Sequence, residues 1–172
     1  MTEEQKRKIE QQLWKIADAL RGKMDASEFK DYMLGFIFYK YLSEKMVLHA
    51  NKILKQNNLT YTNLDKNSDD YEAIIEAIEQ NSIADIGYFL KPEDLFHEIA
   101  KRGSMEGSGE AKFILGDLAR ILKNIQDSTM GTESEDDFIN LFEDLDLDSS
   151  KLGKTVDSRN DLISKILFHL DR

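Results

Sequence analysis

Apolar residues recur at helical spacing along most of the chain. The first such stripe consists of Ile9, Leu13, Ile16 and Leu20, which follow one another every three or four residues, as on the buried face of an α-helix. Thr2 followed by Gln5 forms a capping-box pattern at its start, and Gly22 is a suitable C-terminal stop. These signals predict a first helix that begins after Thr2 and ends near Gly22.

The second predicted helix is apolar on almost every side. It restarts after Asp25 or Ser27 and continues to about Gln56. Its apolar residues are Phe29, Tyr32, Met33, Leu34, Phe36, Ile37, Phe38, Tyr39, Tyr41, Leu42, Met46, Val47 and Leu48. They leave no wide polar stripe, and a helix of this kind is normally buried by neighbours on several sides. Charged residues interrupt the run too often for a membrane span.

The rest of the chain predicts shorter helices separated by polar turns. We expect a helix capped by Ser68, a connection at 82–90, a helix over 93–102 opened by Pro92, a helix over 110–126, and helices near 134–142 and 158–170. The GSMEGSG run at 103–109 predicts a flexible loop, and residues 59–61 allow a short extended piece. We therefore predict an all-α, single-domain bundle of about six to eight helices.

The charge of the chain limits the partners it can bind alone. The net charge is −10, and it is unevenly placed, with +3 over residues 1–60, −7 over 61–127 and −6 over 128–172. An acidic chain is a poor autonomous nucleic-acid binder, because such affinity comes mainly from neutralising phosphates. A few basic contacts within a larger assembly remain compatible with this charge. The polar N-terminus lacks the apolar run of a secretory signal, so we expect a cytoplasmic protein with no membrane partner.

Candidate catalytic, cofactor and metal sites are weak. Residues 153–155, Gly-Lys-Thr, imitate the end of a phosphate-binding loop, but Asp148 stands where that loop needs glycine. Residues 144–148 imitate half of a calcium-binding loop, but Ser149 and Thr155 stand at its essential glycine and glutamate positions. The chain has no cysteine, and its three histidines are scattered. We expect no catalytic residue, cofactor site or metal site within these 172 residues.

Six basic residues gather around two of the predicted turns. Lys15, Arg21 and Lys23 lie around the first inter-helix turn, and Lys151, Lys154 and Arg159 lie around the last. Such clusters contact phosphates without reading sequence, which makes them a candidate nucleic-acid interface. The alternative is that Arg21 and Arg159 pair with nearby carboxylates or cap helix C-termini.

Two other groups of side chains have both a functional and a structural interpretation. Trp14 and the aromatic residues Phe36, Phe38, Tyr39 and Tyr41 could stack on bases, but their helical spacing among apolar neighbours favours core packing. Residues 133–148 hold eight acidic side chains and no basic one. Such a run is usually solvated surface, and the alternative is a docking face for a basic partner.

Two separated blocks of the sequence resemble the start of the methyltransferase subunit of type I restriction–modification systems. The first block comprises Leu13-Trp14, Ala-Asp-Ala-Leu-Arg-Gly at 17–22, Asp-Ala-Ser-Glu-Phe-Lys at 25–30 and Ile-Phe-Tyr-Lys-Tyr-Leu-Ser at 37–43. The second comprises Phe-Glu-Asp at 142–144, Lys-Leu-Gly-Lys-Thr at 151–155 and Ser-Arg-Asn at 158–160. The resemblance covers nearly the whole chain and is weakest between about residues 57 and 111.

The resemblance implies the helical N-terminal domain of a longer protein, with the catalytic methyltransferase domain expected beyond residue 172. That protein would use S-adenosylmethionine to methylate adenine in DNA. Its partners would be a specificity subunit, a restriction subunit and a second methyltransferase subunit, and this domain would help to clamp DNA and assemble the complex. The family's (Asn/Asp)-Pro-Pro-aromatic motif cannot occur here, because Pro92 is the only proline. The alternative is a stand-alone helical adaptor that binds a protein through the acidic run at 133–148.

Overall fold

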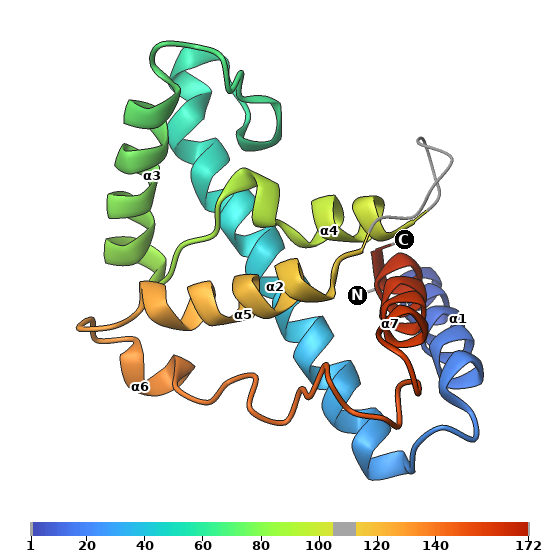
Figure 1. Ribbon diagram of the computed structural model, residues 1–172. Helices are drawn as coiled ribbons and strands as arrows, with labels where there is room; N and C mark the ends of the chain where they lie inside the picture. The colour runs from blue at the N-terminus through green and yellow to red at the C-terminus, as the bar shows by residue number, and fades with distance from the viewer. Residues whose placement is uncertain (1, 105–112, 172) are drawn as a thin grey trace.

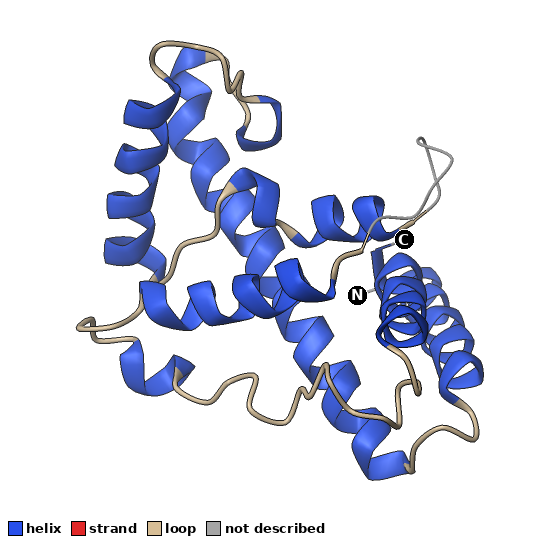
Figure 2. Ribbon diagram, viewed as in Figure 1, coloured by secondary structure: helices blue, strands red, loops and turns tan. Residues whose placement is uncertain are grey.

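The described residues, 2–104 and 113–171 of a computed structural model, form helices joined by turns. The α-helices are α1 (Glu3–Leu20), α2 (Ala26–Leu54), α3 (Tyr71–Ile86), α4 (Phe96–Gly103), α5 (Leu115–Ser128), α6 (Glu135–Phe138) and α7 (Val156–Asp171). Short 3-10 helices η1 (Lys55–Asn57), η2 (Tyr61–Asn63) and η3 (Pro92–Asp94) lie between them. No strand occurs in the described ranges (Figure 2), which confirms the all-α prediction. The predicted loop at 103–109 and the start of the predicted helix at 110 fall largely outside these ranges.

The long helix α2 runs through the molecule, and the other helices are arranged along it (Figure 1). α3 lies beside its C-terminal half, and α4 and α7 contact it further toward its N-terminus. α7 packs against α4 on one side and against α1 on another, so α1 is the outermost helix of this group. The described helices include none with both the length and the apolarity needed to cross a membrane.

Local capping signals set the starts of the first two helices as predicted. Thr2 and Gln5 form a capping box at α1. Asp25 rather than Ser27 caps α2, because its Oδ1 accepts a hydrogen bond from the Glu28 amide at 2.9 Å while Glu28 bonds back to Asp25. Gly22, with φ at +77°, allows the chain to turn between the two helices.

The predicted connection at 82–90 is wrong in its first half. α3 continues to Ile86 and ends at Gly87, whose φ is +87°. Ser82, the first residue of the predicted connection, is buried within the helix, where its hydroxyl donates to the Ile78 carbonyl at 2.6 Å. A helical serine that bonds its own backbone cannot be told from a turn serine in the sequence.

The predicted helix over 93–102 is divided in two. Pro92 opens only the 3-10 turn η3, and α4 starts at Phe96 after Leu95 adopts an extended backbone. The start of α4 is fixed by the Phe96 amide, which donates to the Ser43 hydroxyl of α2 at 3.0 Å. This cap comes from a residue far away in the sequence, so the local pattern could not predict the break.

Within the short extended piece allowed at 59–61, Thr60 has an extended backbone, and Tyr61 then begins the 3-10 turn η2, where its amide donates to the Asn51 side chain at 2.8 Å. Two further predicted elements differ from the structure. The predicted helix at 134–142 ends at Phe138, and Asn140 then has a left-handed φ of +59°. Phe113, which was expected in the fifth helix, precedes α5 and is half exposed.

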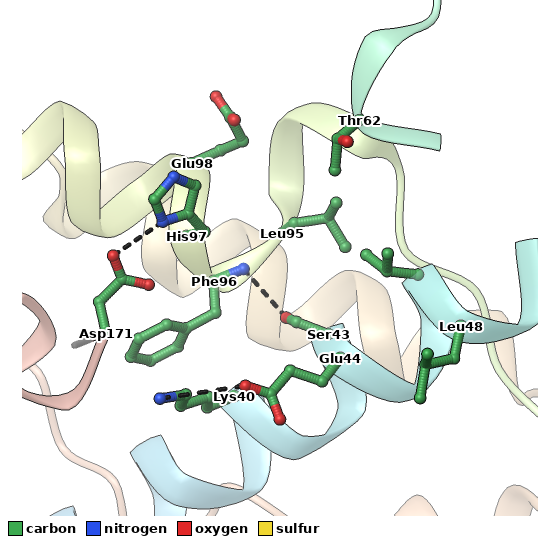
Figure 3. A pocket seen from close by; sticks show the side chains of 11 residues that line it. Lys40, Ser43, Glu44, Leu48, Thr62, Leu95, Phe96, His97, Glu98 and Asp171 are labelled. Carbon is green, nitrogen blue, oxygen red and sulfur yellow. Dashed lines mark hydrogen bonds and ion pairs between the residues drawn. The ribbon is translucent and has the colours of Figure 1, made fainter. Parts of the chain in front are cut away.

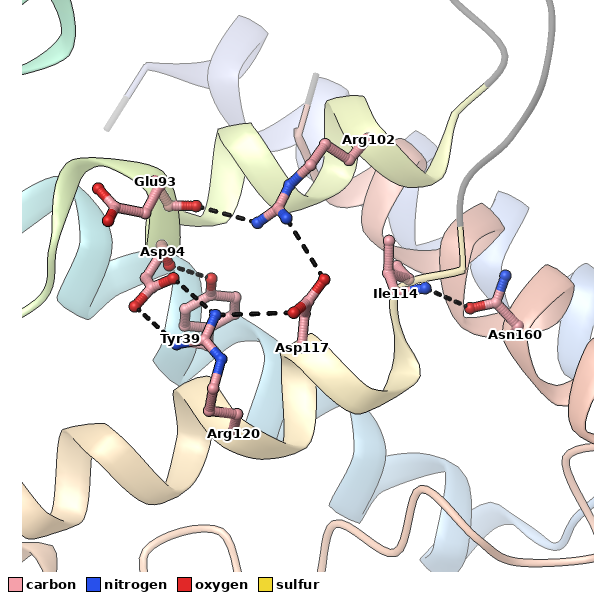
Figure 4. Close-up of polar contacts among 8 residues, drawn as sticks. All are labelled: Tyr39, Glu93, Asp94, Arg102, Ile114, Asp117, Arg120 and Asn160. Carbon is pink, nitrogen blue, oxygen red and sulfur yellow. Dashed lines mark hydrogen bonds and ion pairs between the residues drawn. The ribbon is translucent and has the colours of Figure 1, made fainter. Parts of the chain in front are cut away.

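A partly buried polar network holds η3 and α5 against α2 (Figure 4). The Asp94 carboxylate is buried and accepts two hydrogen bonds from the Arg120 guanidinium, at 3.2 and 3.0 Å. The Asp94 backbone carbonyl accepts the Tyr39 hydroxyl. Arg102 of α4 adds a bond to Asp117 of α5 at 3.3 Å. The network links four segments through polar groups that are satisfied by one another.

The prediction that α2 is buried on several sides is wrong for one face. Phe36, Tyr39 and Met46 are fully buried in the core. On the opposite face Leu34, Ile37, Phe38, Tyr41 and Leu48 are 42–66% exposed. The core interpretation is therefore confirmed for Phe36 and Tyr39 and wrong for Phe38 and Tyr41, because the neighbouring helices cover α2 from one side.

Trp14 also lies outside the core, contrary to prediction. Its side chain is 67% exposed, although Ile16 and Leu20 of the same helix are buried. α1 packs mainly against α7, so the remaining faces of this outermost helix meet solvent. A tryptophan next to the buried stripe is therefore left on the surface.

Candidate nucleic-acid interface

The two basic turns lie at the same end of the molecule (Figure 1). The link between them is an ion pair between Lys151, in the segment that precedes α7, and Glu28 in the first turn of α2. The Tyr32 hydroxyl donates to the Asp146 carbonyl and holds the same segment along α2. A Cβ atom on Gly35 would lie 2.2 Å from Leu145 Cδ1, so glycine permits this close approach. The sequence placed the six cations around two turns, and packing along α2 brings these turns together.

Three of the six basic residues are paired within the domain. Arg21, at the C-terminal cap of α1, pairs with Asp18 at 2.9 Å, which is one of the alternatives the sequence left open. Lys151 pairs with Glu28, as described above. Arg159 is partly buried and donates to the Gly153 carbonyl at 3.2 Å, so it binds the backbone of the preceding loop rather than a carboxylate. These cations are already engaged within the domain.

The other three basic residues are exposed lysines. Lys15 lies on α1, Lys23 lies in the turn between α1 and α2, and Lys154 lies just before α7. Within residues 2–104 and 113–171 none of them has an ion-pair partner. Nearby acidic residues such as Asp25 and Asp157 limit the positive potential at this end. The ammonium groups of these three lysines can contact phosphates. They lack the paired donors with which an arginine guanidinium reads the edge of a base.

The acidic residues at 144–148, which precede Lys151, lie in ordinary turns and loop. Leu145 and Leu147 are buried, as expected from their apolar character, while the acidic residues that alternate with them are exposed. Asp146 Oδ1 accepts a hydrogen bond from the Asp148 amide at 3.0 Å and so closes its own turn. In the part of the chain that the structure describes, no group of three or more histidine or acidic residues could hold a metal ion.

A groove that the sequence did not predict lies between α2, the start of α4 and the end of α7 (Figure 3). It encloses about 500 Å³, and Val47, Leu48, Leu95 and Phe96 form its apolar walls. Two polar pairs lie at its rim, Lys40 with Glu44 at 3.9 Å and His97 with Asp171 at 2.8 Å. Segments distant in the sequence build it, namely α2, η2 through Thr62, the start of α4 and the end of α7, so no local pattern could have revealed it.

The fold and these surfaces define the class of the protein. It is an all-α domain with basic residues at one end and an apolar groove beside α2. Residues 9–170 match the family described as the HsdM N-terminal domain. The chain belongs to this family, the N-terminal domains of the methyltransferase subunits of type I restriction–modification systems. The resemblance seen in the sequence is thereby confirmed.

Two known proteins show the same relationship. The methylase subunit of the type I restriction enzyme MpnII from Mycoplasma pneumoniae is 36% identical over 98% of this chain. The crystal structure of a type I restriction–modification methyltransferase subunit from Streptococcus thermophilus matches 93% of the chain with a TM-score of 0.67 and 30% identity. The chain spans 31% and 32% of the lengths of these two proteins.

Proposed function

We propose that this domain helps a type I methyltransferase subunit to close around DNA and to assemble with its partners. Its contribution to DNA binding consists of phosphate contacts from Lys15, Lys23 and Lys154. The observation that carries the proposal is that Lys23 and Lys154 are exposed where the α1–α2 turn meets the segment preceding α7, with Lys15 exposed on α1 before that turn. Membership of the family supplies the biological setting.

The enzyme that contains such a domain methylates adenine in DNA, with S-adenosylmethionine as methyl donor. In this proposal the cofactor and the target base bind to parts of that protein outside these 172 residues. A specificity subunit reads the DNA sequence, and a restriction subunit and a second methyltransferase subunit complete the assembly. The family membership supports this proposal over a stand-alone adaptor.

The remaining basic residues have a positioning role in this proposal. Lys151 joins the segment preceding α7 to α2 and Arg159 binds the loop before α7, while Arg21 pairs with Asp18 within α1. They fix where the exposed lysines lie rather than meeting phosphates themselves. Because the domain has a net charge of −10, its own affinity for DNA should be weak.

The test replaces the three exposed lysines together. A Lys15→Gln, Lys23→Gln, Lys154→Gln variant should lose most of the binding of the 172-residue chain to a fluorescently labelled duplex at low salt. Each lost phosphate contact removes part of the counterion-release free energy, regardless of DNA sequence. Fluorescence anisotropy with two unrelated duplexes measures the effect.

The control removes the same number of charges elsewhere. Lys55, Lys91 and Lys101 are exposed on η1, before η3 and on α4, away from the α1–α2 turn. Their triple glutamine variant has the same net charge as the first one and should retain near-normal binding. Equal losses in both variants would contradict the proposed interface, because they would show a response to total charge alone.

A further inference from the structure

One face of α2 presents a row of large apolar side chains to solvent. The row consists of Leu34, Ile37, Phe38, Tyr41 and Leu48, here called the α2 stripe, and its members are 42–66% exposed. The first four lie within about two turns on one side of the helix, and Leu48 follows on the same side after Lys45. Single exposed apolar residues are normal on protein surfaces, but several on one side of a helix indicate an interaction surface.

The α2 stripe continues into the apolar groove beside it. Leu48 belongs to the stripe and also lines the groove, where Leu95 and Phe96 form the opposite wall (Figure 3). A groove of about 500 Å³ with mostly apolar walls can receive a few large side chains from a segment lying along α2. The stripe and the groove therefore form one surface, with a flat part and a recess for anchoring side chains.

Lysines accompany the stripe along the same face. Lys30, Lys45 and Lys52 stand four residues before Leu34, after Tyr41 and after Leu48, respectively, and all three are exposed. They have no ion-pair partner among the residues that the structure describes. The nearby Glu44 lies at the groove rim and faces Lys40 at 3.9 Å. With Asp31 and Glu44 also beside the stripe, this face carries a small positive charge in a chain whose net charge is −10.

We propose that the α2 stripe and the groove dock an amphipathic helix of a protein partner whose apolar side is flanked by acidic residues. The apolar residues would meet the stripe, and the carboxylates would meet Lys30, Lys45 and Lys52. This inference rests on the assembly role proposed above and names the surface and the partner chemistry for it.

The charges distinguish this partner from two other occupants. A second copy that used the same face would bring lysines toward lysines, since Lys30 would approach Lys52 in an antiparallel pair of α2 helices. DNA would satisfy the lysines but would leave five large apolar side chains against phosphates and sugars. An acidic amphipathic helix satisfies both the apolar and the basic parts of the surface.

The test uses two synthetic helical peptides of roughly 18 residues, about five turns. Both carry leucine at the stripe spacing, with glutamate at the flanking positions in one and lysine in the other. The glutamate peptide should bind the 172-residue chain saturably, and the lysine peptide should bind at least about tenfold more weakly. Absence of saturable binding by the glutamate peptide, or equal binding of the two peptides, would overturn the proposal.

Variants of the chain locate the binding surface. Phe38→Ser with Tyr41→Ser should weaken binding of the glutamate peptide by at least about tenfold, because exposed aromatic residues dominate such contacts. The matched control, Met130→Ser with Ile139→Ser, changes side chains that are 66% and 59% exposed elsewhere and should leave binding unchanged. Equal losses in these two variants would overturn the assignment to α2.

A charge reversal gives the sharpest outcome. Lys30→Glu, Lys45→Glu and Lys52→Glu together should invert the preference, so that the lysine peptide becomes the tighter ligand. Sedimentation of the unmodified chain should show a monomer, and self-association that Phe38→Ser with Tyr41→Ser abolishes would overturn the proposal in favour of a second copy. Because none of these readouts involves DNA, this inference and the proposed phosphate contacts can fail separately.

Discussion

At the scale of single residues, the pair formed by Asp94 and Arg120 is the ion pair that we expect to contribute most to the stability of the fold. The Asp94 carboxylate is buried, whereas the Arg120 side chain is 47% exposed (Figure 4). The hydrogen bonds from Arg120 to Asp94 raise the pKa of the guanidinium. Without them, Asp94 would be a buried carboxylate with no cation beside it, which is costly.

We therefore expect Arg120→Ala to lower the free energy of unfolding by about 1–3 kcal/mol. Lys123→Ala on the same helix is the control, because its pair with Asp127 joins two exposed side chains and should contribute less than about 1 kcal/mol. Urea unfolding followed by circular dichroism measures both values. Equal losses would show that the network around Asp94 does not hold η3 against α5.

Predictions for single residues were confirmed where the partner of the residue is only a few positions away in the sequence. Thr2 was identified as a cap, and Asp25 as one of two candidates, because their partners lie three residues away. Trp14, Phe38 and Tyr41 were misplaced because exposure depends on which neighbouring helix covers a face. The lysines that recur along the α2 face were visible in the sequence, and together with the apolar residues between them they could have indicated a solvent-exposed stripe.

At the scale of the elements, three buried tyrosines tie α2 and η2 to the segment that precedes α4. The Tyr39 hydroxyl donates to the Asp94 carbonyl, the Tyr61 hydroxyl to the Leu90 carbonyl and the Tyr88 hydroxyl to the Leu42 carbonyl. Burial is the main cause that raises the pKa of each phenol above its ordinary value of 10.0. The folded state therefore favours the neutral phenols.

This pKa shift predicts the loss of stability in alkali. The contribution of the three phenols is fully present below the unfolded-state pKa of about 10, and it is lost as the pH rises above that value, because the unfolded chain releases these protons first. Far-UV circular dichroism and the absorbance of ionised tyrosine at rising pH should show helix loss together with ionisation. Ionisation of these three tyrosines near pH 10 with unchanged helical content would contradict the packing described here.

The order and approximate positions of the helices could be predicted from the sequence because apolar spacing and caps are local signals. Two of the helix boundaries that were predicted wrongly are set by residues distant in the sequence. Ser43 caps the start of α4, and Asn160 of α7 accepts the Ile114 amide at 2.8 Å immediately before α5. The groove was missed for the same reason, since its walls come from α2, α4 and the end of α7.

At the scale of the whole molecule, the two proposed contact surfaces meet along α2. The basic end lies at the α1–α2 turn, and the α2 stripe begins about two turns into the helix with Leu34. The domain as a whole is strongly negative, and part of that charge, in the run at 133–148, lies beside the basic end, so the general surface disfavours nucleic acid. In our account a domain of this kind adds a few contacts to a complex in which other parts supply most of the affinity.

The salt dependence of DNA binding by the 172-residue chain tests this account most directly. Three phosphate contacts predict a slope of roughly −2.7 for the logarithm of the binding constant against the logarithm of the salt concentration, at about 0.9 per contact. The glutamine variant of Lys15, Lys23 and Lys154 should reduce that slope to near zero. No binding even at the lowest salt, or a slope unchanged by the variant, would contradict a role for this end of the domain on the DNA backbone.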